Sequence, residues 1–138
     1  MTEEFIKDFW RGIKHFDYHE FSSPEDPESG LKMNFSLIQG LERLREITGR
    51  PIIIHHNGGF AASGHSDGSH HYEGRAADFH FDWLDLMLRQ QAKIVFNSMH
   101  FSGIGLYPEW AHPGFHVDSR LGPFQVWVER AGKYLYLF

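Results

Sequence analysis

Two short segments alternate apolar and polar side chains, and this alternation determines which face of a sheet each residue occupies. Residues 76–81 place both phenylalanines on one face of a strand and Asp78 on the other. In residues 115–118, phenylalanine and valine share one face, and His116 and Asp118 share the opposite face. The apolar faces require a core, so the polar faces of the two strands can converge on one point. A carboxylate and an imidazole presented from one sheet face can bind a metal ion.

A long loop rich in small and polar residues precedes the first of these strands. Residues 56–69 are rich in glycine and serine and include Asn57, and a loop of this length in a compact domain is usually functional. It leads to His71, and Gly74 gives the backbone the freedom to turn towards Asp78. Two imidazoles and a carboxylate are ligands typical of a catalytic zinc site. The other interpretation is that Asp78 and Asp118 are exposed strand residues beside a solvated histidine loop.

Composition restricts the chemistry further. The chain has 138 residues, eleven histidines and no cysteine, so disulfides and thiol catalysis are excluded. A structural zinc site commonly uses cysteine and fills all four positions, whereas a catalytic site leaves one for water. Eleven histidines are too many for one ion, and several are expected to be solvated or packing residues. The residue types therefore indicate metal-assisted hydrolysis.

Charge and hydropathy bear on the partners. The net charge of −5 argues against nucleic acid or an anionic membrane as the main partner. No apolar stretch approaches the length of a membrane span. The N-terminal residues carry neither a basic region nor an apolar run, so no signal peptide is expected.

Two amphipathic helices are predicted. The first is capped by Asn34, runs to about Thr48 and ends at Gly49. The second is predicted over residues 83–97. The residues expected along the apolar side of the first helix are Leu37, Ile38, Leu41, Leu44 and Ile47. Those expected along one side of the second are Leu84, Leu88, Gln91 and Val95.

Short strands complete the predicted fold. Residues 51–54 form an apolar segment that we expect in the centre of a sheet. Further strands are predicted over residues 104–107, 124–129 and 134–138. No repeat or linker interrupts the chain, which has a hydrophobic content of 41%. Helices early and strands later predict a single α+β domain over residues 1–138, with a central antiparallel sheet flanked by helices.

Two separated motifs resemble a known family. The first has the pattern Ser-x-His-x-x-Gly-x-Ala-x-Asp and is formed by Ser69, His71, Gly74, Ala76 and Asp78. The second comprises residues 103–108 and 115–120. Both are similar to motifs of the zinc D-Ala-D-Ala carboxypeptidases and related peptidoglycan endopeptidases, which include phage endolysins. That family belongs to a larger group with the lysostaphin-type peptidases and the hedgehog signalling domain. The resemblance covers roughly residues 15–128 and implies the fold of that group.

The resemblance implies roles for individual residues. Zinc would be bound by His71, Asp78 and His116. Asp118 is the favoured general base, although it can instead orient a ligand histidine or an arginine. His112 is the other candidate for proton transfer. In addition, His70 is expected to point away from the ion, and His80 to lie in its outer shell or at the surface.

One segment departs from the family pattern. After the apolar strand, many members carry a Ser-Gly-Tyr-Arg type segment whose arginine engages the substrate, whereas residues 55–60 read His-His-Asn-Gly-Gly-Phe. Arg75 and Arg120 are the candidates to replace it in substrate binding. Ser69 and Gly74 are interpreted as structural residues of the motif. The sequence leaves open whether Tyr107, Trp110 and Trp127 line a substrate groove or serve ordinary packing.

The resemblance leads to an expected function. We expect a zinc-dependent peptidase that hydrolyses amide bonds of bacterial peptidoglycan peptides, as a carboxypeptidase or an endopeptidase. Without an export signal, the protein is expected to be synthesised in the cytoplasm and to act after lysis or as a component of a phage particle. The alternative is a non-catalytic zinc-containing binding or structural module of the same fold. Histidine abundance also leaves nickel or copper as possible metals.

Overall fold

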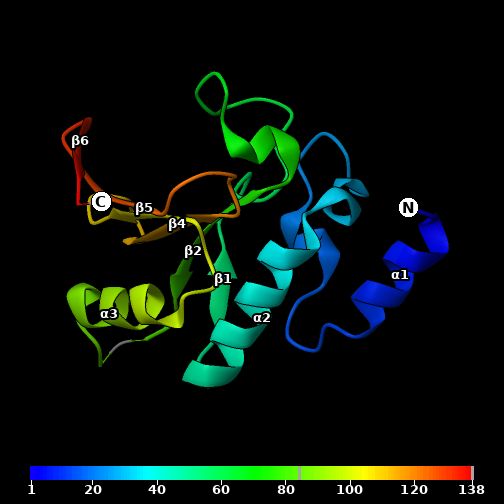
Figure 1. The fold of residues 1–138 in the computed structure, drawn as a ribbon, viewed down its shortest axis with the longest axis horizontal. Helices are drawn as coiled ribbons and strands as arrows, with labels where there is room; N and C mark the ends of the chain where they lie inside the picture. Colours follow the sequence, from blue (N-terminus) through cyan, green and yellow to red (C-terminus); the bar gives the residue numbers. More distant parts are fainter. Residues whose placement is uncertain (84, 138) are drawn as a thin grey trace.

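In the part of the chain that the structure describes, the fold consists of three α-helices, three short 3₁₀ helices and one six-stranded sheet. The structure is a computed structural model and describes residues 1–83 and 85–137 (Figure 1). The helices are α1 (Glu3–Arg11), α2 (Phe35–Thr48), α3 (Leu88–Ser98), η1 (Tyr18–Phe21), η2 (Ser29–Lys32) and η3 (His70–Glu73). The strands are β1 (Ile52–Ile54), β2 (Ala76–Phe81), β3 (Gly103–Tyr107), β4 (Gly114–Asp118), β5 (Gln125–Arg130) and β6 (Lys133–Tyr136). The predicted single α+β domain is confirmed.

The sheet is mixed rather than antiparallel. Its strand order is β1-β2-β4-β3-β5-β6, and β3 and β5 pair in parallel, while the other neighbours are antiparallel. The prediction of an antiparallel sheet is therefore wrong for this pair. Residues 119–124 carry the chain past the start of β3, so that β5 pairs on the far side of β3 instead of beside β4.

The apolar segment after α2 lies at an edge of the sheet. We expected a central strand, but β1 is the first strand in the order and pairs with β2. Ile53 is 43% exposed, whereas Ile52 is buried. The three isoleucines are thus buried, exposed and partly buried in turn. An apolar run alone does not distinguish an edge strand from a central one.

The alternation of β2 and β4 places their apolar residues in the core as predicted. Phe79, Phe115 and Val117 are fully buried. They belong to the same core cluster as Leu37 of α2 and Val95 of α3. Figure 1 shows α2 and α3 on one side of the sheet and the loop that leads into η3 on the other. The polar face of β2 and β4 is therefore left for this loop.

The helix boundaries follow local capping. Asn34 caps α2 by accepting a hydrogen bond from the backbone N–H of Leu37 at 3.1 Å, and Gly49 ends it with φ of 64°. The predicted buried stripe ends at Leu44, because Ile47 in the last turn is 57% exposed.

The helix predicted from residue 83 begins later, at Leu88. Trp83 instead stacks on Phe81 at the end of β2, with a ring-centroid distance of 4.8 Å. Leu84, expected on the apolar side, lies outside the described residues, as does Phe138 at the end of the last predicted strand. Helix α1 was not predicted. Within residues 1–83 and 85–137, none of the helices has the length and apolarity needed to cross a membrane.

Candidate metal centre

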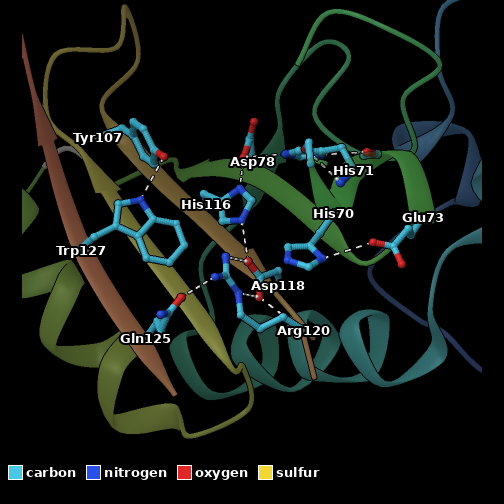
Figure 2. A network of polar contacts seen from close by, with 12 residues as sticks. His70, His71, Glu73, Asp78, Tyr107, His116, Asp118, Arg120, Gln125 and Trp127 are labelled. Carbon is cyan, nitrogen blue, oxygen red and sulfur yellow. Dashed lines mark hydrogen bonds and ion pairs between the residues drawn. The ribbon is translucent and has the colours of Figure 1, made fainter. Parts of the chain in front are cut away.

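A cavity of about 950 Å³ opens on the sheet face opposite α2 and α3. The polar residues of β2 and β4 line one part of it, together with histidines from the loop and from η3. Aromatic residues of β3, β5 and β6 line another part. Figure 2 shows the polar contacts at its centre, where His116 lies between Asp78 and Asp118.

One register row across the sheet organises the site. Asp78 of β2 is the cross-strand partner of His116 of β4, which in turn pairs with Gly105 of β3. Gly105 pairs on its other side with Trp127 of β5, and Trp127 pairs with Tyr136 of β6. Residues directly opposite one another in a sheet share a face. A carboxylate, an imidazole and two aromatic rings therefore lie in one line on the cavity face.

His71 approaches this row from η3. The Ser69 side chain caps η3 by accepting a hydrogen bond from the His71 backbone N–H at 3.2 Å. Gly74 ends η3 with φ of 71°, a conformation that favours glycine, and turns the chain into β2. The His71 side chain is 2% exposed and places Nε2 at 3.2 Å from Asp78 Oδ1. Its other nitrogen, Nδ1, lies 2.9 Å from the carbonyl oxygen of Gly59.

His116 contacts a carboxylate at each ring nitrogen. Nδ1 lies 3.0 Å from Asp78 Oδ1, and Nε2 lies 2.8 Å from Asp118 Oδ2. Burial disfavours the charged imidazolium, but hydrogen bonds to Asp118 and Asp78 outweigh it and raise the pKa of His116 to about 9. Burial likewise disfavours charge on Asp78, yet hydrogen bonds from His116 and His71 hold the pKa of this carboxyl well below its usual range. Asp78, His116 and Asp118 thus form one hydrogen-bonded network.

Asp118 is fully buried and bound on both oxygens. Arg120 donates to Oδ1 from Nε at 2.8 Å and to Oδ2 from Nη2 at 2.7 Å. The Arg120 side chain also donates from Nη1 to Gln125 and lies over the ring of Trp127, 5.0 Å from its centroid. Burial disfavours the charged carboxylate, but the bonds from His116 and Arg120 outweigh it, and the pKa of Asp118 is lowered. Asp118 therefore links a candidate metal ligand to a cation.

His65 joins the cluster from the loop and was not singled out from the sequence. Its ring stacks on that of His71 with centroids 3.9 Å apart, and its Nε2 lies 2.8 Å from the carbonyl oxygen of Asn57. His65, His71 and Asp78 each offer one ligand atom, and these atoms lie within 4.8 Å of one another. This group can hold a metal ion. The only sequence signal for His65 is its position in the loop that was expected to be functional.

The surroundings of the three histidines fit metal binding. One nitrogen of each ring lies beside an oxygen that accepts hydrogen bonds, namely the carbonyls of Gly59 and Asn57 and the carboxylate of Asp118. A metal-binding histidine usually donates its second ring N–H to a carbonyl or carboxylate, which leaves the other nitrogen free for the ion. Nitrogen donors with one carboxylate suit zinc.

The predicted arginines differ in their placement. Arg120 lines the cavity, although Asp118 and Gln125 engage its guanidinium. Arg75 instead donates from Nη1 to the carbonyl oxygen of Ser119 at 3.0 Å and joins the start of β2 to the residues after β4. Among the described residues, it does not belong to the cavity lining.

A second group of histidines lies further along the same cavity. His55 Nε2 is 2.8 Å from His80 Nδ1, and the His80 ring stacks on that of His112 at a centroid distance of 4.8 Å. His55 also contacts Trp110, with centroids 5.0 Å apart. His112 and His55 line the cavity, as does His70, whose Nδ1 lies 3.3 Å from Glu73 Oε1. The segment of residues 55–60 thus adds two imidazoles, those of His55 and His56, to the cavity wall.

Gly105 allows the indole of Trp127 to approach His116, a candidate metal ligand. A Cβ atom at position 105 would lie 2.5 Å from Trp127 Nε1 and 2.7 Å from Tyr107 Cε1. With glycine there, the Trp127 ring comes within 5.5 Å of the His116 ring, measured between centroids. Gly103 lies two residues before Gly105 on the same face of β3 and likewise leaves room for the Asp118 carboxylate and for Arg120.

Replacing Gly105 with alanine is expected to displace Trp127 and to destabilise the fold by about 1–3 kcal/mol, because both crowded neighbours are rings. The near-ultraviolet circular dichroism of tryptophan and a urea titration measure the two effects. Gly12→Ala is the control, since its nearest neighbour would be a carbonyl oxygen at 3.4 Å and it lies outside the cavity. Unchanged spectra and stability for Gly105→Ala would contradict the packing described.

Comparisons of the chain with protein-family models, with curated proteins and with solved structures find no match.

Proposed function

We propose that this chain is a zinc-dependent peptidase that hydrolyses amide bonds in bacterial peptidoglycan peptides. One observation carries the metal part: a single carboxylate oxygen, Asp78 Oδ1, is approached by Nε2 of His71 at 3.2 Å and by Nδ1 of His116 at 3.0 Å. The resemblance of the two sequence motifs supports the peptide substrate. The same resemblance leads us to propose that the α+β fold belongs to the group of D-Ala-D-Ala peptidases and hedgehog domains.

Two ligand sets share His71 and Asp78 and differ in the third residue. His65 completes the set by proximity, since its ligand atom lies within 4.8 Å of the other two. We propose His116 instead, because its Nδ1 contacts Asp78 while its Nε2 is held by a buried carboxylate. Carboxylate–histidine pairs of this kind orient metal ligands and raise their basicity. His65 then flanks the site through its stacking on His71.

A bound zinc ion would supply Lewis-acid polarisation of a carbonyl and a lowered pKa for water. The contribution of the chain is orientation and proton transfer. Both oxygens of Asp118 are engaged by His116 and Arg120, and these contacts favour orientation of His116 over service as the general base. We assign proton transfer to His112, which lines the cavity as a member of the second histidine group.

The test is hydrolysis of purified peptidoglycan peptides by zinc-loaded protein, with a chelator-treated sample beside it. We expect products only in the zinc-loaded sample and recovery of activity when zinc is restored. Mass spectrometry identifies the bond: loss of a terminal D-Ala indicates a carboxypeptidase, and split stems or cross-links indicate an endopeptidase. Absence of products from protein that contains stoichiometric zinc, over cross-linked and uncross-linked substrates, would refute the peptidase.

One observation favours a second candidate, a zinc-containing binding module without turnover. Among the described residues that line the cavity, Arg120 is the one residue with a lysine or arginine side chain. Its guanidinium donates hydrogen bonds to Asp118 and Gln125. A guanidinium that is already paired is less available to a substrate carboxylate. This module would retain zinc and bind peptidoglycan fragments without releasing products. Elemental analysis of the purified protein separates zinc from nickel or copper in either case.

We also propose where the protein acts. Peptidoglycan lies outside the cytoplasmic membrane, so a peptidase made in the cytoplasm reaches it after lysis or as part of a phage particle. Immunodetection of the protein in purified phage particles, and in culture fluid before and after lysis, tests this placement.

A further inference from the structure

We infer that the aromatic side of the cavity binds the neutral sugar rings of a glycan strand, while the metal cluster faces the peptide attached to it. This inference rests on the proposed function and names its substrate as glycan-linked rather than free peptide. The surface concerned is called the aromatic wall and consists of Tyr107, Trp110, Trp127, Tyr134 and Tyr136, all of which line the cavity.

The aromatic wall is continuous with the candidate metal ligands. Trp127 lies in the same register row as His116, and their ring centroids are 5.5 Å apart. Tyr136 is the cross-strand partner of Trp127, at a centroid distance of 6.0 Å. Tyr134 pairs with Glu129 and therefore faces the same side as Tyr136. A ligand that spans the cavity can contact the metal cluster at one end and aromatic faces at the other.

The rings of the inner part of the wall are held in place by contacts with one another. Tyr107 and Trp110 stack almost in parallel, with centroids 4.3 Å apart and an angle of 10° between the rings. Trp127 Nε1 donates to the Tyr107 hydroxyl at 3.0 Å, which fixes the ring of Tyr107. Rigid aromatic groups bind with little loss of conformational entropy. Tyr107, Trp110 and Trp127 are therefore arranged before a ligand binds.

The charged and polar side chains of the cavity favour a neutral ligand that carries polar groups around its edge. Among the described lining residues, Arg120 is the one lysine or arginine, and its guanidinium is bound by Asp118 and Gln125. A polyanion would therefore lack free cationic partners. Tyr134 and Tyr136 are 56% and 58% exposed and add hydroxyl groups to the wall. An N-acetylated sugar combines apolar C–H faces with hydroxyl and amide groups at its rim, which matches this surface.

The distances across the sheet fit a peptide between the two regions. Adjacent strands lie roughly 4.8 Å apart, so β6, three strands from β4, lies about 14 Å away. An extended peptide spans about 3.5 Å per residue, so roughly four residues cover this distance. A peptide of about this length between the sugar and the scissile amide would bridge the two regions. The wall thus holds the glycan at a distance that leaves the peptide at the metal cluster.

The experiment is a nuclear magnetic resonance titration of the full chain with a β-1,4-linked N-acetylglucosamine tetramer, in the presence of a chelator. We expect saturable shifts of the tryptophan side-chain signals. Trp110→Ala and Tyr136→Ala are each expected to weaken binding at least fivefold. Leu135→Ala is the matched control, because Leu135 lies on β6, is 64% exposed and points to the opposite face from Tyr134 and Tyr136.

The outcomes separate this inference from the proposed function. Tetramer binding that is lost in both wall variants and retained in Leu135→Ala supports the inference, even if no hydrolysis is detected. Failure of the wild-type protein to bind the tetramer overturns it, as does equal binding by all variants. Binding of a free stem peptide to the aromatic wall, without binding of the tetramer, also overturns the inference. That result would assign the aromatic wall to the peptide. Zinc-dependent hydrolysis is measured separately on free and glycan-linked peptides.

Discussion

Replacing His116 with alanine is expected to abolish zinc retention and all measurable hydrolysis. The change removes one of three proposed ligands and leaves the buried Asp118 carboxylate without the imidazole that it contacts at 2.8 Å. Loss of an outer-shell partner alone usually costs about 10–100-fold in metal affinity or activity, so loss of a ligand should exceed about 100-fold. Zinc is measured by elemental analysis after gel filtration, and affinity by competition with a chelator.

His65→Ala is the matched control for His116→Ala. His65 stacks on His71 but lies outside the proposed ligand set, so this variant is expected to keep its zinc. Circular dichroism checks that both variants are folded. Zinc retained by His116→Ala and lost by His65→Ala would replace the proposed set with His65, His71 and Asp78. Loss in both variants would indicate four protein ligands, which is typical of a structural rather than a catalytic site.

Strand periodicity allowed much of the site to be predicted. The side-chain period of a strand is two, so burying Phe79 leaves Asp78 on the other face, and burying Phe115 does the same for His116. The structure brings Asp78 and His116 together as direct cross-strand partners. The helix from its Asn34 cap to Thr48 followed equally local signals. The strand faces and the helix ends both depend on residues that are close together in the sequence.

Features set by the path of the chain were not predicted. The parallel pairing of β3 with β5 depends on how residues 119–124 pass β3, and no periodic pattern encodes that path. The edge position of β1 also depends on which strands lie beside it rather than on its own three isoleucines. Helix α1, which was not predicted, begins at a Thr2 cap and carries acidic residues in its first turn, both of which are local signals for a helix.

Contacts between distant loops account for the rest of the site. His65 reaches His71 because the loop folds back and fixes its ring on the Asn57 carbonyl, which spacing along the chain does not reveal. The glycines at positions 103 and 105 were visible in the sequence. They share one face of β3, and Arg120 and the Trp127 indole fill the space above it, a packing that was not predicted.

Replacing Asp118 with asparagine is expected to lower zinc affinity by about 10–100-fold, because an amide is a weaker partner for His116 and cannot pair with Arg120 as an anion. If orientation is its role, turnover at saturating zinc should recover most of the wild-type rate. A general base would give the opposite result: unchanged zinc affinity and a rate reduced by about 10²–10⁴-fold. The zinc dissociation constant and kcat at saturating zinc are therefore measured together.

His112→Ala provides the comparison for Asp118→Asn. His112 lies in the cavity wall and stacks on His80, outside the proposed ligand set, so its loss should leave zinc affinity intact and reduce kcat. Reduced affinity in Asp118→Asn beside reduced kcat in His112→Ala would assign orientation to one residue and proton transfer to the other. A reduced kcat with unchanged zinc affinity in Asp118→Asn would assign the base to Asp118. Normal values in both variants would remove both residues from the mechanism and leave the ligand set as the catalytic contribution of the chain.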